Sequence, residues 1–305
     1  IMRGAMSEGR QWLEAFLKQT HQVQVSGAIC AGAQYVAGDL AALQDDSSAA
    51  ISLLEASLRF YQAEGDHFGL ARVLDLLGRS IFRQGDTARG IELIDESLAH
   101  YRELRNVHGI AQSLFSRASA ELQWNGDVVR AMALAEESIH LFRQTGDLRG
   151  RRDALSLLGW ALHDQGDLER GTSLLEEALE TARNLGDQQR IMEDLGFLAV
   201  ISYRRGALER ARLLLGELVV LARDLGSSFS LYFALVQVGV RERYAGNLKQ
   251  AMSSLEKALR LMPQPAAPFR NALLQRYLAD VLYDQGETGA AAQIYRTSLS
   301  TFYAL

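Results

Sequence analysis

Apolar residues recur every three or four positions along most of the chain, and short polar turns interrupt them. This spacing places the apolar side chains on one face of an α-helix. Many of the turns read Gly-Asp, as at Gly85-Asp86, Gly126-Asp127 and Gly166-Asp167. Glycine adopts the left-handed backbone that ends a helix, and the Asp side chain accepts hydrogen bonds from the first amides of the next one. The pattern predicts an alternation of helix and turn.

The turns follow a register of about forty residues. Their second members lie at positions 46, 86, 127, 167, 207, 247 and 287, so the successive spacings are 40, 41, 40, 40, 40 and 40 residues. A second series, half a period away, includes Gly65-Asp66, Gly146-Asp147 and Gly186-Asp187. Each repeat is therefore predicted to be a pair of helices, which we call its first and second helix.

Buried and close-packed positions are predicted by the same register. Small residues stand seven positions before the turn glycine and five after it, as at Gly78 with Gly90 and Gly159 with Gly171. Small side chains allow two helix backbones to approach closely, so these positions predict the contact points of each pair. The second helices are predicted to bury Leu58, Leu98, Ile139, Leu179, Val219, Leu259 and Leu299.

The composition agrees with an all-helical chain and argues against some classes of function. The three prolines of the 305 residues all fall between positions 263 and 268, which leaves the rest free of helix breakers. The net charge of −5 argues against direct nucleic-acid binding. Cys30 is the single cysteine, which favours a reducing compartment. No apolar run approaches the roughly 20 residues of a membrane span. We expect a cytoplasmic protein without membrane contact.

The alternation of small, aromatic or aliphatic, and small residues resembles the tetratricopeptide repeat, LGxxY followed by AxxxF and A. Seven matches in register cover almost the whole chain. The period is about 40 rather than 34 residues, so each helix is nearly a turn longer, and the signature tryptophan and terminal proline are absent. This variety, with phrases such as LLEEALETARNLGD, is similar to the sensor arms of large bacterial signalling ATPases of the STAND class, including LuxR-type transcription regulators.

The resemblance implies an all-α, right-handed superhelical solenoid of antiparallel helix pairs. Seven repeats would form one continuous domain over residues 27–305, after an N-terminal half-repeat helix in residues 1–26 with Gly9 at its small position and Trp12, Leu13 and Leu17 at apolar ones. Residues 1–6 are a candidate for vector-derived sequence and are left out of the fold prediction. The half-repeat start and the uncapped last helix predict a piece of a longer protein, with an ATPase module in the same parent chain.

Motifs of catalysis, cofactor binding and metal binding are not found in the sequence, so we expect no enzyme, no cofactor and no metal site. His67 and His108 share the start of successive first helices and would lie roughly 10 Å apart without a third ligand. His163 beside Asp164 could suggest a catalytic dyad. Neighbouring side chains diverge by about 100° on a helix, so we expect no direct contact between these two.

In tetratricopeptide superhelices the first helices line a concave groove through the second, fifth, ninth, twelfth and thirteenth residues of the repeat. Aromatic and arginine side chains at those positions are suited to anchor a partner, and the arginines of the second repeat suit a carboxylate or phosphate. The alternative is that aromatics just before a turn only fill space between stacked turns. The candidate groove residues are Arg72, Asp75, Arg79, Arg83, Trp124, Trp160, His163, Asp164, Tyr203, Arg204, Arg243, Tyr244 and Tyr283.

Three functions remain open from the sequence. We expect a non-catalytic sensor arm that binds a protein or small-molecule effector in the groove. A passive scaffold or peptide-binding module is the alternative, although the candidate groove positions lack the asparagines with which peptide-binding relatives hold a peptide backbone. An enzyme would rest on the pair His163 and Asp164 alone.

Overall fold

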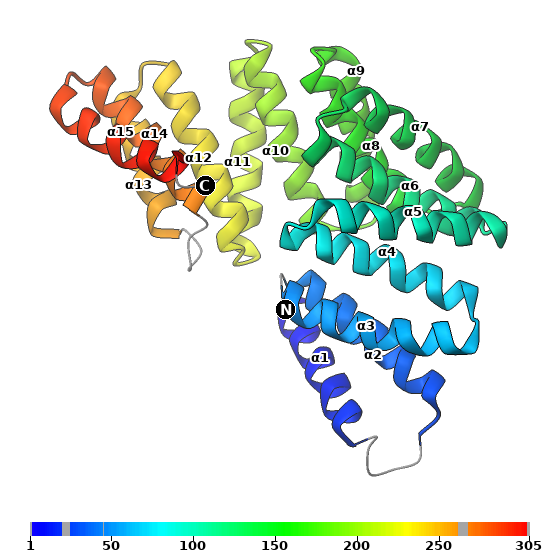
Figure 1. The fold of residues 1–305 in the computed structure, drawn as a ribbon. Coiled ribbons are helices and arrows are strands. Elements are labelled where there is room, and N and C mark those ends of the chain that lie inside the picture. The colour runs from blue at the N-terminus through cyan, green and yellow to red at the C-terminus, as the bar shows by residue number, and fades with distance from the viewer. Residues whose placement is uncertain (1, 20–24, 45, 262–267, 304–305) are drawn as a thin grey trace. The chain divides into compact units, whose positions relative to one another are not determined.

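The computed structural model describes residues 2–19, 25–44, 46–261 and 268–303, and almost all of them are helical (Figure 1). First and second helices pack as antiparallel neighbours, so the predicted all-α solenoid of helix pairs is confirmed. Within the described residues, no helix combines the length and apolarity needed to cross a bilayer. The elements are α1 (Met2–Gln19), α2 (Gly27–Leu43), α3 (Ser47–Glu64), α4 (His67–Gln84), α5 (Thr87–Glu103), α6 (Val107–Ala120), η1 (Glu121–Asn125), α7 (Val128–Thr145), α8 (Leu148–Asp164), α9 (Leu168–Asn184), α10 (Gln188–Arg204), α11 (Leu208–Asp224), α12 (Ser228–Tyr244), α13 (Leu248–Leu261), α14 (Pro268–Asp284) and α15 (Thr288–Tyr303).

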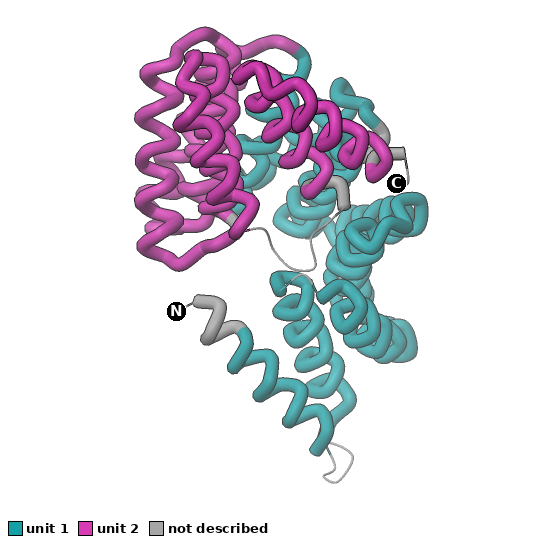
Figure 2. The backbone as a smooth tube through the Cα atoms, turned by 90° about the vertical axis from the view of Figure 1, so that its left-hand side faces the viewer, with its two compact units in different colours: residues 1–165 teal, residues 166–305 magenta. Residues whose placement is uncertain are grey.

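The helices divide into two compact units, coloured separately in Figure 2. Unit 1 covers residues 1–165 and contains α1 to α8 with η1. Unit 2 covers residues 166–305 and contains α9 to α15. The single continuous domain over residues 27–305 stays a prediction.

The turns end and begin helices as their residues predict. Gly65 and Gly85 have φ of 66° and 108°, the left-handed conformation that glycine adopts without a steric penalty. The Asp66 carboxylate accepts hydrogen bonds from the amides of Phe68 and Gly69, at 3.0 and 2.9 Å. Arg105, with φ of 53°, stands where the half-period series lacks its glycine. The register of the sequence is therefore a register of helix caps.

The one spacing of 41 residues has a structural counterpart at the end of α6. There the chain forms the short π-helix η1, in which hydrogen bonds span five residues and so take up one extra residue. The first residue of η1, Glu121, is buried, and its Oε1 pairs with Arg117 Nη1 at 2.6 Å and Arg130 Nε at 3.3 Å. The insertion is thus absorbed within a turn, and the helices after it return to the forty-residue register.

The small residues mark close backbone approach, as predicted. A Cβ atom added to Gly78 would lie 2.7 Å from the Gly90 carbonyl oxygen, and one added to Gly90 would lie 2.8 Å from that of Gly78. α4 and α5 therefore touch through backbone at this point. In the half-repeat, a Cβ on Gly9 would reach 3.7 Å from Leu40 Cδ1, which places the small position of α1 against α2.

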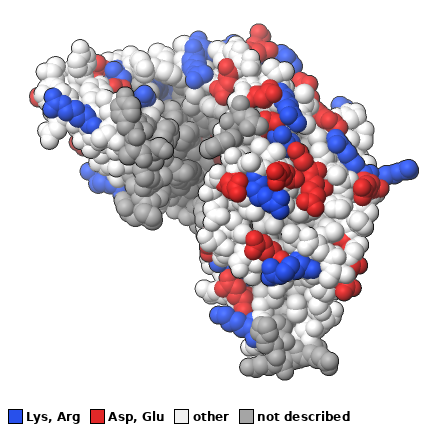
Figure 3. All heavy atoms as spheres, viewed as in Figure 1, with Lys and Arg blue, Asp and Glu red and all other residues white. Residues whose placement is uncertain are grey.

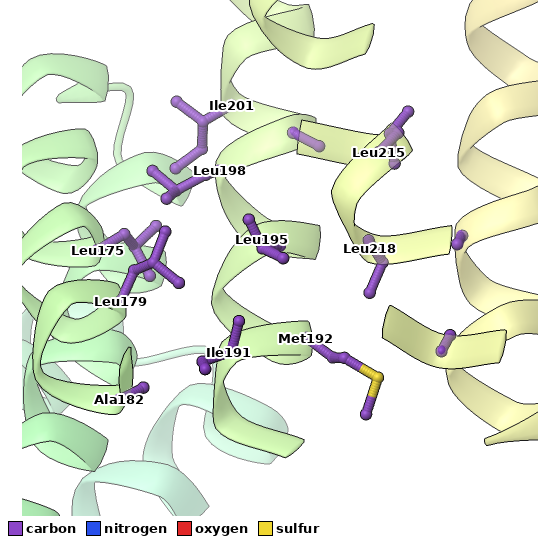
Figure 4. Packing of buried hydrophobic residues seen from close by; sticks show 13 residues of the cluster. Leu175, Leu179, Ala182, Ile191, Met192, Leu195, Leu198, Ile201, Leu215 and Leu218 are labelled. Carbon is purple, nitrogen blue, oxygen red and sulfur yellow. The ribbon is translucent and has the colours of Figure 1, made fainter. Parts of the chain in front are cut away.

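Leucines from neighbouring helices fill the cores. In unit 2, Leu175 of α9, Leu195 of α10 and Leu215 of α11 interdigitate in one cluster (Figure 4). Predicted core positions at the ends of the array were wrong: Leu259 and Leu299 are 44% and 52% exposed, and Trp12 is 72% exposed. The buried stripe of α13 follows Ala251, Leu255 and Ala258, so the next residue, Leu259, points away from it.

Candidate functional site

A pocket of about 350 Å³ in unit 1 collects residues from four helices and one turn. We call it the α4 pocket because α4 supplies more of its lining residues than any other helix. Its volume lies within the range of ligand sites, about 300 to 1,000 Å³. The lining residues are Tyr35 and Asp39 of α2, Phe68, Arg72, Asp75 and Arg79 of α4, Tyr101 of α5, Asn106 at the N-terminal cap of α6, and His108, Gly109 and Gln112 of α6.

The sequence of α4 separates a core face from a pocket face. Val73, Leu74 and Leu77 are buried among the apolar residues of neighbouring helices. Arg72 and Asp75 are three residues apart and Arg79 follows four later, the spacing that puts side chains on one helix face. The apolar side anchors α4, and that anchoring holds the three charged groups in place.

Asp75 is the most buried charged group of the α4 pocket. Its side chain is 5% exposed, and Oδ2 lies 3.2 Å from Arg79 Nε. Burial raises the pKa of Asp75, while Arg79 and hydrogen bonding from Ser116 and Ser113 oppose that rise. The carboxylate therefore orients Arg79 and offers an acceptor to a ligand.

Arg72 lies over two aromatic rings. Its guanidinium carbon lies 4.3 Å from the centre of the Tyr35 ring and 5.7 Å from that of Phe68. Burial raises the pKa of Tyr35, and the Arg72 charge opposes that rise. A guanidinium stacked by its face keeps its N–H edges for hydrogen bonds to a carboxylate or phosphate. The pocket thus combines two arginines, a buried acid and stacking rings.

Of the predicted groove residues in the second repeat, the structure brings Arg72, Asp75 and Arg79 together. Arg83 is exposed near the end of α4 and does not line the α4 pocket. The side chain of Trp124, predicted for the third repeat, lies outside the described part of the structure.

Sequence reasoning missed several lining residues of the α4 pocket. Tyr35 and Asp39 are the fifth and ninth residues of the first repeat, so the same groove numbering, applied there, finds both. Tyr101 lies on a second helix and Phe68 in the first turn of α4. No groove numbering finds those two, because they reach the pocket from the junction between repeats.

The pair His163 and Asp164 departs from the prediction. His163 Nδ1 lies 3.2 Å from Asp164 Oδ1, so the expectation that they would not touch was wrong. The Cα–Cβ bonds diverge, but rotation about the side-chain bonds brings the two groups together. The His163 side chain is completely buried, and the half-buried Trp160 stacks on its ring with centroids 4.8 Å apart. Of these three residues His163 is buried, Trp160 is half-buried and Asp164 is exposed, and their role in the groove stays a prediction.

In unit 2 the predicted Arg243 lies over the ring of the predicted Tyr244, with 5.5 Å between the guanidinium carbon and the ring centre, and two further contacts involve predicted residues. The rings of Tyr203 and Tyr244 lie 5.4 Å apart, from α10 and α12. Arg243 pairs with Asp280 at 2.7 Å and with Asp284 at 2.6 Å. Tyr283 and Arg204 are exposed and take part in neither contact as the structure describes them.

Arg243 belongs to a small network on α12, α14 and α15. The Tyr295 hydroxyl donates to Asp280 Oδ1 at 2.6 Å, and burial together with this bond raises the pKa of Tyr295 to about 12. The hydrogen bond to Asp284 raises the pKa of Arg243. Because both acids already neutralise Arg243, this network is better suited to join helices than to bind an anion.

A family profile and solved structures relate this architecture to known proteins. A family profile described as tetratricopeptide repeat matches residues 152–185. A search of curated protein sequences found no match.

Many solved structures share the fold at low sequence identity. The quorum sensor NprR from B. thuringiensis, in its apo form, superposes with a TM-score of 0.72 at 15% identity, over 98% of this chain and 84% of that one. The Rap conjugation gene regulator of plasmid pLS20, in complex with the Phr* peptide, has a TM-score of 0.65 at 13% identity, over 89% and 73%.

A third solved structure is a STAND protein with a tetratricopeptide repeat sensor from Pyrococcus horikoshii. Its TM-score is 0.68 at 15% identity, and the match covers 95% of this chain but 44% of that protein. The sensor resemblance seen in the sequence therefore extends to the three-dimensional fold. Together with the seven-repeat register, these likenesses show that the fold is a tetratricopeptide-like helical solenoid, and the family profile itself matches residues 152–185.

Proposed function

We propose that the chain is a non-catalytic effector-binding solenoid, and that the α4 pocket of unit 1 binds the effector. The observation that carries the proposal is the grouping of Arg72 and Arg79 around the buried Asp75, beside the stacking rings of Tyr35 and Phe68. Donors, an acceptor and rings in one cavity are the groups that recognise a ligand. The lining residues include no serine, cysteine or lysine nucleophile.

A short peptide with an acidic group is the effector class that these residues fit best. The arginines suit its carboxylate, Asp75 and Asp39 suit main-chain amides or an amine, and the rings suit an apolar side chain. On the face seen in Figure 3, acidic and basic side chains are interspersed, which does not favour a uniformly charged partner such as DNA. The peptide complex of one structural neighbour supports the same class.

The test is a binding screen with fluorescent heptapeptides in matched pairs, acidic and amidated. An acidic peptide should bind the wild-type chain, and Arg79→Glu should weaken that binding about tenfold or more, because a charge-assisted hydrogen bond contributes about 1.5–3 kcal/mol. Arg89→Glu is the matched control, since Arg89 of α5 is exposed and pairs with Glu92 outside the pocket. Equal binding by Arg79→Glu and wild type would contradict the pocket assignment.

We infer further that the solenoid is the sensor arm of a larger bacterial signalling ATPase and works in the cytoplasm. The extent of its match to the Pyrococcus horikoshii protein supports this, because the chain corresponds to 44% of that protein. Sequencing the parent gene tests the inference directly. A nucleotide-binding module in the same reading frame is expected, and its absence would favour the passive scaffold instead.

A further inference from the structure

Two histidines and a glutamate meet at one edge of unit 1, where α4 begins and α5 ends. His67 is the first residue of α4, and His100 and Glu103 lie in the last turn of α5. His67 Nδ1 and His100 Nδ1 are 3.2 Å apart, and His100 Nδ1 is 3.9 Å from Glu103 Oε2. All three ligand atoms lie within 4.8 Å of one another. The sequence did not suggest this group, because it paired His67 with His108.

We propose that His67, His100 and Glu103 form a binding site for a divalent transition metal such as Zn²⁺. Two imidazole nitrogens bound to a tetrahedral zinc at 2.0–2.1 Å lie about 3.3 Å from each other. The observed separation of 3.2 Å matches that geometry without movement of either helix. Two imidazoles and one carboxylate are a ligand set that zinc uses with an open fourth position.

The local structure explains how His67 comes to lie beside His100, 33 residues later in the sequence. α4 and α5 are antiparallel partners in backbone contact at Gly78 and Gly90, so the start of one helix lies beside the end of the other. His100 and Glu103 are three residues apart and share a face of α5. His67 and Glu103 are exposed and His100 is half-buried, so an ion can reach the site from solvent.

The site also touches the wall of the α4 pocket through neighbouring residues. Phe68 follows His67, Tyr101 follows His100, and both of these rings line the pocket. The rings contact each other edge to face, with centroids 6.2 Å apart. A metal ion that joins the two histidines would therefore tie α4 to α5 next to the pocket. The metal proposal does not depend on the proposed effector, because it rests on the three ligands alone.

The experiment is a calorimetric titration of the full chain with ZnCl₂, without a histidine tag and with Cys30→Ser, which removes the single cysteine. One Zn²⁺ per chain should bind. His67→Ala and His100→Ala should each weaken binding at least tenfold, and Glu103→Gln should weaken it several-fold. With Co²⁺, the wild type should show the visible absorption bands of tetrahedral coordination, and His67→Ala should lose them.

The matched control is His108→Ala. His108 also lies at the start of a first helix, but its Nδ1 faces one carboxylate, that of Asp147, at 3.6 Å. Its replacement should leave zinc affinity unchanged. Circular dichroism of each variant separates a lost ligand from a lost fold, because all three side chains lie at helix ends away from the core. No saturable binding by the wild type, or equal affinity in folded His67→Ala, would overturn the proposal.

Discussion

Unit 1 and unit 2 repeat the same forty-residue register, yet different side chains join their helices. In unit 1 one buried serine in each of α3, α5 and α7 donates to a carbonyl of the first helix of its pair: Ser57 to Ala31, Ser97 to Ala71 and Ser138 to Ala111, at 2.7–2.8 Å. The matching positions of unit 2 are Ala178, Leu218, Ala258 and Ser298. Ser298 keeps the bond, to Ala272 at 2.8 Å.

The contact between successive repeats differs in the same way. In unit 1 an aromatic ring near the end of a second helix packs on a glycine in the first turn of the next helix: Tyr61 on Gly69, Tyr101 on Gly109 and Phe142 on Gly150. In unit 2 the ring positions hold Ala182 and Ala222, and the glycine positions hold Arg190 and Ser230. Unit 1 thus pairs a large ring on the second helix with a glycine on the next helix, whereas both ring positions of unit 2 hold alanine.

The repeat therefore determines where helices meet but not which side chain fills each contact. A ring on a glycine permits one arrangement, because close-packed interiors tolerate few others. It also gives unit 1 its pocket, since Tyr101 and Gly109 are both lining residues. The substitutions that follow test these contacts in order of expected effect.

The largest loss is expected from Phe142→Ala. Phe142 is fully buried between Gly150 and the ring of His108, with ring centroids 5.9 Å apart. Its removal leaves a cavity, which should cost about 3–5 kcal/mol of unfolding free energy. Urea unfolding followed by circular dichroism measures the loss, and hydrogen exchange should locate it in α7 and α8. Ala182→Gly, at the matching position of unit 2, should cost about 1 kcal/mol or less. Equal losses would remove the distinction between the units.

Gly109→Ala should have the next largest effect. An added Cβ would lie 2.2 Å from Tyr101 Cδ1, so the ring must move, and overpacking of this kind costs about 1–3 kcal/mol. Tyr101→Leu in the same chain should recover part of that cost, which a double-mutant cycle measures. Ser230→Ala, at the matching position of unit 2, creates no overlap with a ring and removes one part-buried hydrogen bond from Ser227, so it should cost about 0.5–1.5 kcal/mol. Strictly additive losses would show that ring and glycine do not act as a pair.

Part of this structure could be predicted from the sequence, and part could not. Short-range rules predict the helix caps, the pairing of helices, and the close approach at Gly78 and Gly90, because turns and helix faces are local properties. The single spacing of 41 residues likewise marks the repeat in which η1 takes up one extra residue. Whether Leu259 is buried depends on which side of α13 the neighbouring helices cover, and local spacing does not contain that information. The same reason explains why Trp12 and Leu299 were misplaced.

The candidate site was predictable in part for a similar reason. Arg72, Asp75 and Arg79 stand at groove positions that the tetratricopeptide resemblance implies, and they share one helix face, so the repeat numbering finds them. Tyr101 and the group of His67, His100 and Glu103 arise where the end of one helix meets the start of another. His67 was expected near His108 because both occupy the same repeat position, whereas its neighbour is His100, across the antiparallel pair.

A smaller effect is expected from the buried serines. Ser138→Ala should lower the unfolding free energy by about 0.5–1.5 kcal/mol, because it removes a buried hydrogen bond to the Ala111 carbonyl. Ser300 is a control, since its hydroxyl also donates to a carbonyl, that of Thr297, but at an exposed position. Ser300→Ala should change stability by less than about 0.5 kcal/mol. If Ser138→Ala is equally silent, the serines of unit 1 are fillers like the alanines of unit 2.

The smallest effects are expected at two acids of unit 1, Asp75 and Asp46, whose pKa values in the folded chain are shifted in opposite directions. Burial raises the pKa of Asp75 above its unfolded value, so the folded chain keeps this proton to higher pH, and stability falls as pH rises through the interval between the two values. Asp75→Asn removes that fall, and its melting temperature should exceed that of wild type slightly at neutral pH, with the gain lost in acid.

The pKa of Asp46 is shifted in the opposite direction, because the hydrogen bond from Arg10 lowers it. Asp46→Asn should therefore be less stable than wild type at neutral pH, and the gap should close as pH falls through the folded pKa. Melting curves of both variants across the acid and neutral range check the pair. A gap of the same sign for both would mean that burial does not govern Asp75, and the acceptor placed in the α4 pocket would lose its physical basis.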